Sequence, residues 1–197
     1  MRRAARSVRK AVPAPKTAAL VTALKSCWRS RVHEDRLLAV LVAEAYRRQF
    51  TDRHVATLLK AWLRGSANWD FVDAISTFVV GHIALDHPAA WREIERWSTH
   101  EWMWLRRASV LCHIPAVRAR APRTAQLRRT INRLVDEKEF FIRKAIGWTL
   151  REIAQTDPAL AEKLIREFWD RASGVTRREA LRRLPAARRK VLLAELG

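Results

Sequence analysis

The feature that most constrains the fold is a short segment that recurs five times along the chain. The segments DRLLA, DFVDA, WLRRA, FIRKA and TRREA align on their final residues, Ala39, Ala74, Ala108, Ala145 and Ala180. Successive alanines are separated by 35, 34, 37 and 35 residues. A unit of this length accommodates a pair of helices, and a small residue at a fixed position allows a neighbouring helix to pack closely. The spacing therefore predicts a stack of helix pairs.

Hydrophobic periodicity supports this interpretation. After Pro15, apolar residues recur every three or four positions, and no long alternating run of β-branched residues occurs. Helix-start signals stand at Thr51, Asn68, Asp157 and Thr176, the last with Glu179 at the capping-box position. The predicted helices cover residues 16–29, 34–48, 52–64, 68–84, 88–98, 101–114, 123–136, 138–155, 158–172, 176–184 and 186–196.

The pattern predicts an all-α protein, a curved α-solenoid of HEAT-like helical repeats. We expect residues 16–197 to form a single domain, preceded by a basic N-terminal segment, residues 1–15, that is a candidate for disorder. Tetratricopeptide repeats, the alternative, have a similar period. Their W-x2-L-G-x2-Y pattern is absent from this sequence, which contains one tyrosine.

The charge of the chain indicates an anionic partner. Lys and Arg number 39 against 20 Asp and Glu, a formal net charge of +19. Such a charge attracts polyanions with a strong dependence on salt, which favours nucleic acid, with an anionic membrane surface or the ribosome as alternatives. No stretch approaches the roughly 20 apolar residues of a membrane span, and no apolar signal-peptide core precedes Pro13. We expect Cys27 and Cys112 to be reduced core thiols in a cytoplasmic protein.

One position of the repeat combines charged and aromatic side chains. The residues before the aligned alanines are Leu38, Asp73, Arg107, Lys144 and Glu179. Equivalent positions of a solenoid line one surface, and Trp69, Trp104 and Trp148 lie three or four residues from this column, on the same helix face. Asp73 is either the ion-pair partner of Arg107 or a carboxylate that stabilises positive charge on a sugar and orients a water.

Trp148 has two interpretations as well. On a helical wheel it lies at the margin of the core, where it either packs on the next repeat or offers its face to a ligand. Gly147 beside it makes room either for a packed helix or for a nucleic-acid backbone. The scattered histidines contain no H-E-x-x-H motif, and no Gly-rich phosphate loop or G-x-S-x-G motif occurs, so we expect no metal and no cofactor.

Four segments carry a resemblance to a known family: NWDFVD (68–73), WMWLRRASVL (102–111), EFFIRKAIGWTLREIAQTDP (139–158) and TRREALRRL (176–184). With these, the sequence resembles the AlkD-like DNA alkylation repair glycosylases, which have HEAT-like repeats. The resemblance implies an enzyme that excises cationic N3- and N7-alkylated purines from double-stranded DNA. It implies hydrolysis of the N-glycosidic bond in base excision repair, without metal, cofactor or flipping of the lesion into a deep pocket.

The resemblance also implies roles for individual residues. Asp73 corresponds to the catalytic aspartate, Trp69 and Trp148 to two tryptophans that contact the deoxyribose, and Arg107 to a phosphate-binding arginine. The same segments supply further expected DNA-binding residues, namely Arg106, Arg143, Lys144, Arg151, Arg177 and Arg178. The expected partner is duplex DNA with alkylated bases, bound by a monomer that does not associate with membranes and is located in the cytoplasm at the nucleoid.

The chain departs from the family near its N-terminus. The resemblance implies an additional helix or two before the first repeat, and we expect KAVPAPKTAAL at residues 10–20 to replace that segment. Because the replaced segment can border the lesion site in the family, we expect the replacement to affect catalytic efficiency and substrate range. The alternatives to a glycosylase are a non-catalytic HEAT-repeat protein that binds nucleic acid and a scaffold for an acidic protein partner.

Overall fold

The computed structural model describes residues 1–196, and this range contains helices and no strand. The prediction of an all-α fold made of helical repeats is confirmed. Contacts divide the chain into two compact units. Unit 1 comprises Met1–Glu93, and unit 2 begins at Ile94.

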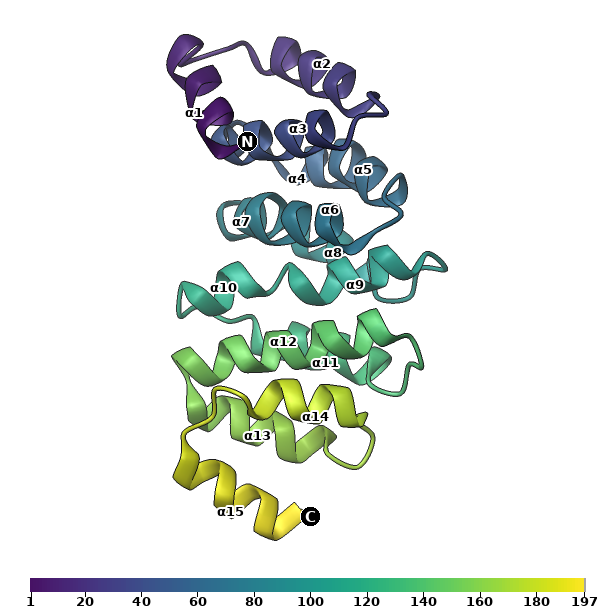
Figure 1. Ribbon diagram of the computed structural model, residues 1–197, viewed down its shortest axis with the longest axis vertical. Helices are drawn as coiled ribbons and strands as arrows, with labels where there is room; N and C mark the ends of the chain where they lie inside the picture. The colour runs from purple at the N-terminus through teal and green to yellow at the C-terminus, as the bar shows by residue number, and fades with distance from the viewer. Residues whose placement is uncertain (197) are drawn as a thin grey trace. The chain divides into compact units, whose positions relative to one another are not determined.

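Unit 1 contains three separate helices, a 3-10 turn and two longer helical runs. It starts with α1 (Arg2–Ala11), α2 (Thr17–Trp28) and α3 (His33–Ala45), followed by the 3-10 turn η1 (Arg47–Gln49). Figure 1 shows α2 and α3 side by side at the purple end of the ribbon. Two longer helical runs follow, each with a π-helical segment in its middle: α4 (Asp52–His54), η2 (Val55–Leu59) and α5 (Lys60–Arg64), then α6 (Trp69–Ala74), η3 (Ile75–Val80) and α7 (Gly81–Asp86).

The N-terminal residues form a helix that packs on α3. Arg2 forms an ion pair with Glu44 at 2.9 Å, and Ala5 is buried. The Tyr46 hydroxyl donates a hydrogen bond to the carbonyl oxygen of Val12. Part of the segment that was a candidate for disorder thus forms helix α1, whose basic side chains contact a carboxylate and an aromatic ring.

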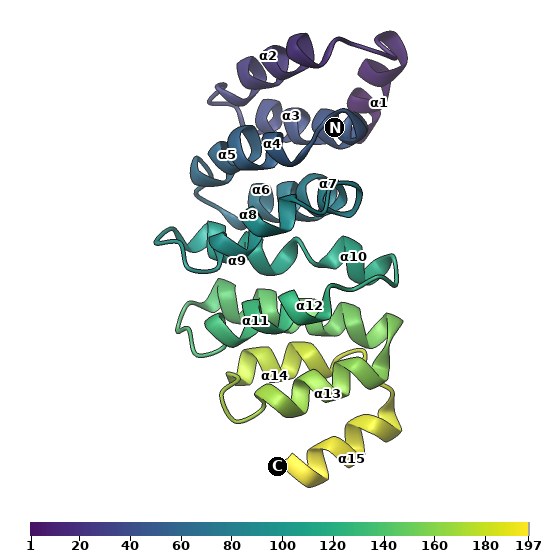
Figure 2. The same ribbon diagram turned by 180° about the vertical axis from the view of Figure 1, so that it is seen from behind.

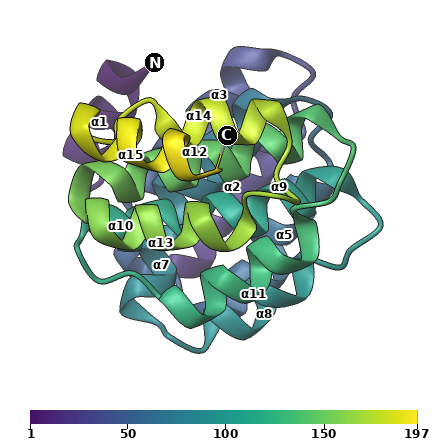
Figure 3. The ribbon, with the colours of Figure 1, turned by 90° about the horizontal axis from the view of Figure 1, so that it is seen from below.

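Unit 2 consists of two layers of helices. α8 (Ala90–Trp97) crosses the boundary between the units and is followed by α9 (Met103–Leu111), α10 (Ile114–Arg118), α11 (Thr124–Leu134), α12 (Phe140–Thr156), α13 (Pro158–Phe168), α14 (Gly174–Leu181) and α15 (Ala186–Leu196). α12 packs between α9 and α14. Figure 2 shows α11 and α13 in front of these helices, and Figure 3 shows α12 and α14 as neighbours.

The five aligned alanines are all buried. Each of them is at most 6% exposed. Gly147 also lies at a packed position, because a Cβ atom at this position would lie 2.6 Å from Cβ of Glu179 and 2.9 Å from the carbonyl oxygen of Thr176. Of the two interpretations of Gly147, the structure therefore supports close packing of α12 against α14.

The helix boundaries agree with the sequence pattern except at a few points. Asp157 caps α13 as predicted, since its Oδ1 accepts the Leu160 N–H at 2.9 Å. The predicted start at Thr176 is wrong: α14 begins at Gly174, and Ser173 is its cap. Thr176 instead donates from Oγ1 to the carbonyl oxygen of Arg143 at 3.0 Å, joining α14 to α12. The pattern also missed α1 and α10 as separate helices.

Candidate functional site

An exposed tryptophan and a carboxylate lie one turn apart on α6. Trp69 is the first residue of the helix and is 55% exposed, whereas Asp73 is half-buried. Asp70 fixes the first turn, because its Oδ1 accepts the Phe71 N–H at 2.8 Å and its Oδ2 lies 3.0 Å from Nε2 of His33. The π-helical segment η3 begins two residues after Asp73, and such segments often occur at functional sites. α6 thus presents an indole face beside a negative charge.

Trp148 on α12 is held by a carboxylate that the sequence analysis did not single out. Its Nε1–H donates to Oε1 of Glu152 at 2.8 Å, and Oε2 of Glu152 accepts from Nε of Arg118 at 2.8 Å. Burial raises the pKa of Glu152, but the hydrogen bonds from Arg118 and Trp148 outweigh it, so that the pKa lies below its ordinary value. Glu152 is therefore ionised and fixes the indole ring. Its spacing of four residues from Trp148 was the signal available in the sequence.

Arg107 is buried, although the sequence analysis expected it to contact phosphate. It is 3% exposed, and its Nη1 donates to the carbonyl oxygen of Phe141. Its guanidinium also lies 5.8 Å from the centroid of the Phe141 ring. Trp104, expected near the charged column, is buried too, with its ring centroid 5.1 Å from that of Phe141. Arg107 therefore connects α9 to the start of α12, and its contact with phosphate stays a prediction.

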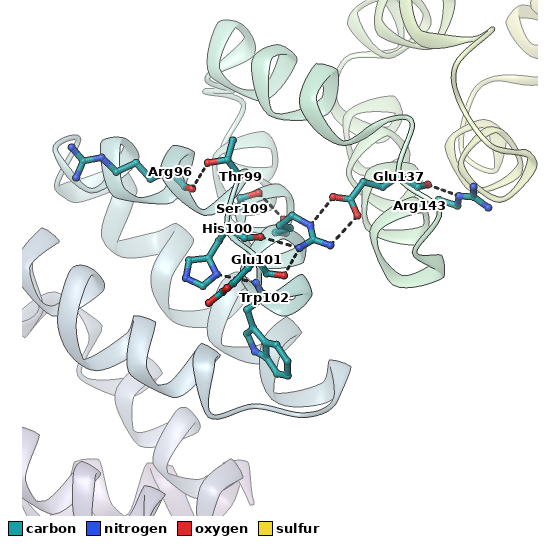
Figure 4. A network of polar contacts seen from close by, with 9 residues as sticks. Arg96, Thr99, His100, Glu101, Trp102, Ser109, Glu137 and Arg143 are labelled. Carbon is teal, nitrogen blue, oxygen red and sulfur yellow. Dashed lines mark hydrogen bonds and ion pairs between the residues drawn. The ribbon is translucent and has the colours of Figure 1, made fainter.

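Arg106 and Arg143 bind protein groups in the loops that precede α9 and α12. Nε of Arg106 lies 2.6 Å from Oε1 of Glu137, and its Nη1 donates to the carbonyl oxygens of His100 and Glu101 at 2.9 and 2.7 Å. Arg143 donates from Nε to the Glu137 carbonyl oxygen at 2.7 Å. Figure 4 shows how Glu137 joins the two loops. Both guanidinium groups thus stabilise loops.

The remaining predicted DNA-binding residues divide into two groups. Arg151 forms an ion pair with Glu179, and Arg177 donates to the carbonyl oxygen of Trp169 at 2.9 Å and stacks on its ring. Lys144 and Arg178 are the exposed members of the predicted DNA-binding set.

Further cations surround a pocket that the sequence analysis did not predict. It has a volume of about 540 Å³ and lies at the carboxyl ends of α10, α12 and α14. Its lining consists of Arg118, Arg151, Glu152, Gln155, Thr156, Arg182 and Arg183. The run RRLPAARRK at 182–190 was the signal in the sequence, although the convergence with Arg118 was not visible there.

Residues 1–196 contain no group of three or more His, Cys, Asp or Glu side chains that could hold a metal ion. In the same range, no helix combines the length and apolar character needed to cross a bilayer. His113 is buried, and desolvation lowers its pKa to about 3, so its imidazole is neutral at physiological pH.

Comparison with known proteins identifies the family. The family described as DNA alkylation repair enzyme matches residues 1–184. A solved structure described as a predicted DNA alkylation repair enzyme from Enterococcus faecalis is similar with a TM-score of 0.80 and 25% sequence identity, over 92% of this chain and 82% of that chain. No curated protein matches the chain. Since the family match spans nearly the whole chain, this protein belongs to the DNA alkylation repair enzyme family.

Proposed function

We propose that this protein is a DNA glycosylase that hydrolyses the N-glycosidic bond of cationic N3- and N7-alkylated purines in double-stranded DNA. The observation that carries the proposal is the pair on α6, in which the exposed Trp69 indole lies one turn from the Asp73 carboxylate. Family membership supports a role in alkylation repair. The net charge of +19 supports binding to the DNA backbone.

The proposed chemistry relies on the charge of the lesion. An alkylated purine cation leaves as a neutral base with the electrons of the N-glycosidic bond, so no strong general acid is required. Asp73 stabilises the oxocarbenium-like sugar and positions the water that adds to its anomeric carbon, with release of a proton. The face of Trp69 contacts the cationic sugar through its π electrons. The exposure of Trp69 supports excision without flipping of the base into a deep pocket.

The other residues of the proposal bind and orient the DNA. Within unit 2, Trp148, fixed by Glu152, offers an indole face to the DNA. Because Arg107 is buried and Arg106 binds Glu137, we assign the first contacts with phosphate to the exposed Lys144 and Arg178. Arg107 then acts on α12 through its bond to Phe141.

A base-release assay tests the proposal. Purified protein is incubated with methylated duplex DNA, and free 3-methyladenine and 7-methylguanine are measured. We expect release by the wild type and a rate at least about a hundredfold lower for Asp73→Asn, since a preorganised charge at the transition state contributes this much or more. Binding of the duplex should persist in the variant. Glu101→Gln, which removes an exposed carboxylate, is the matched control and should retain full activity.

The alternative is a family member that binds nucleic acid without catalysis. It is favoured by the number of predicted DNA-binding arginines that contact protein groups instead, Arg106, Arg107, Arg143, Arg151 and Arg177. Salt-dependent binding of methylated duplex by folded protein, without base release at any salt concentration, would refute the glycosylase proposal and leave this alternative.

A further inference from the structure

The arginine pocket at the carboxyl ends of α10, α12 and α14 holds more positive charge than its carboxylates balance. Glu152 accepts from Arg118, and Glu179 binds both Arg151 and Arg182. Two carboxylates therefore face four guanidinium groups of the pocket lining, which also includes Arg183. Within residues 1–196, Arg183 has no hydrogen bond or ion pair, and it is exposed. Two positive charges remain in excess.

The pocket combines fixed and adaptable cations. Arg118 and Arg151 are held by carboxylates on α12 and α14, so their positions are set before a ligand arrives. The side chains of Arg118 and Arg182 are 51% and 65% exposed, which leaves donor groups facing solvent. Converging like charges repel one another in a concave space, and a bound anion relieves this repulsion while the concavity strengthens the local field.

We infer that this pocket binds a phosphate group. The guanidinium fork matches two phosphate oxygens with parallel hydrogen bonds, and several forks around one concavity provide donors from different directions. Gln155, which also lines the pocket, adds an uncharged donor. Of the lining residues, Arg151 was an expected DNA-binding residue and Glu152 orients Trp148, whereas Arg118, Arg182 and Arg183 have no role in the proposed function.

The phosphate comes either from the DNA backbone or from a free phosphate compound. The first case rests on the proposed function and extends its DNA contact beyond Trp148. The pocket is connected to Trp148 through Glu152, which accepts hydrogen bonds from both Arg118 and the Trp148 indole. A backbone phosphate at Arg118 would therefore lie next to the carboxylate that orients Trp148. In the second case the pocket is an independent anion site.

The test uses the full-length protein and unmodified duplex DNA. Affinity is measured over a range of salt concentrations for the wild type, Arg183→Ala and the double variant Arg182→Ala/Arg183→Ala. We expect affinity to fall about three- to tenfold per arginine, and the slope of log affinity against log salt to become shallower by about one per lost phosphate contact. Arg123→Ala, an exposed arginine just before α11 and outside the pocket lining, is the matched control.

Calorimetric titration with inorganic phosphate distinguishes the two sources. Altered duplex binding assigns the pocket to the DNA backbone. Phosphate binding by the wild type that is lost in the double variant, with duplex binding equal to the Arg123→Ala control, assigns it to a free phosphate compound. Duplex and phosphate binding that both equal the control would overturn the inference. Because base release is not measured, failure of the glycosylase proposal leaves these readouts intact.

One control guards against misfolding. Arg182 binds Glu179, so the double variant removes a contact between neighbouring parts of α14. Where circular dichroism shows that the double variant is unfolded, Arg183→Ala decides the question alone, since its side chain bonds no residue in the described part of the chain. An unchanged salt slope and unchanged phosphate binding in that variant would refute the inference.

Discussion

Two helices of this protein carry a tryptophan and a carboxylate at the same spacing, in different surroundings. Trp69 and Asp73 on α6, and Trp148 and Glu152 on α12, each place an indole four residues before a carboxylate. On α12 the pair is closed by a hydrogen bond of 2.8 Å, and Trp148 is half-buried. On α6 the indole is 55% exposed. One pair is fixed as part of the structure, while the other presents its aromatic face to solvent.

The α12 pair shows that a contact from a neighbouring helix can fix an i, i+4 pair of side chains. Arg118, at the end of α10, binds Glu152 from 34 positions away in the sequence. That ion pair holds the carboxylate where the Trp148 N–H reaches it. The α12 pair therefore holds an indole ring in place, whereas a ligand contact for the α6 pair belongs to the proposed function.

The largest effect on stability is expected for Glu152→Gln, which tests whether the Glu152 carboxylate holds Trp148 in place. The variant keeps the side-chain volume but removes the charge that Arg118 and Trp148 share. Hydrogen bonds to buried charged groups contribute more than neutral ones, so we expect a loss of about 2 to 3 kcal/mol in the free energy of unfolding. Urea denaturation measures it, with Glu101→Gln as control. Equal stability of the two variants would show that the α12 pair is not closed in solution.

The second prediction concerns the pH dependence of unit 2. Burial lowers the pKa of His113 from 6.5 to about 3. Between about pH 3 and pH 6.5, the unfolded state therefore binds a proton at His113 that the folded state does not bind. His113 thus contributes stability above pH 6.5 that is lost as the pH falls. The loss should reach about 2 kcal/mol at pH 5.

Hydrogen exchange at α9 and α10, measured between pH 7 and pH 5, checks this expectation after correction for the intrinsic exchange rates. In His113→Asn the dependence on pH should flatten in unit 2. Burial also lowers the pKa values of His54 and His82 in unit 1, so unit 1 should keep its own dependence in the variant. An unchanged pH profile at α9 and α10 of the variant would contradict the assignment.

The sequence predicted the repeat well because its signal is local. Ala39, Ala108 and Ala145 mark packed positions through their size and period alone, and the structure buries them. The pattern could not predict the partners of the arginines. Arg107 reaches Phe141 from 34 positions away, and Arg106 reaches Glu137 from 31. The resemblance to a family names such residues, but burial depends on contacts between helices that no single segment encodes.

Only part of the candidate site could be predicted from the sequence. The exposed position of Trp69 at the start of α6 is consistent with the expected ligand face, and its role in catalysis stays a prediction. Glu152 was missed, although it follows Trp148 by four residues, because Trp148 was paired with Lys144 in the sequence. The arginine pocket was missed because it combines residues from three helices.

The smallest expected effect comes from the same replacement at the two tryptophans. Trp148→Phe keeps most of the ring but removes the N–H that Glu152 accepts, so we expect a loss of about 1.5 kcal/mol in the free energy of unfolding. Trp69→Phe changes a side chain that is largely exposed and should alter stability by less than about 0.5 kcal/mol. Urea denaturation of both variants measures the difference. Equal losses of stability at the two positions would contradict the distinction between the hydrogen-bonded Trp148 and the exposed Trp69, since both indoles would then be equally important for folding.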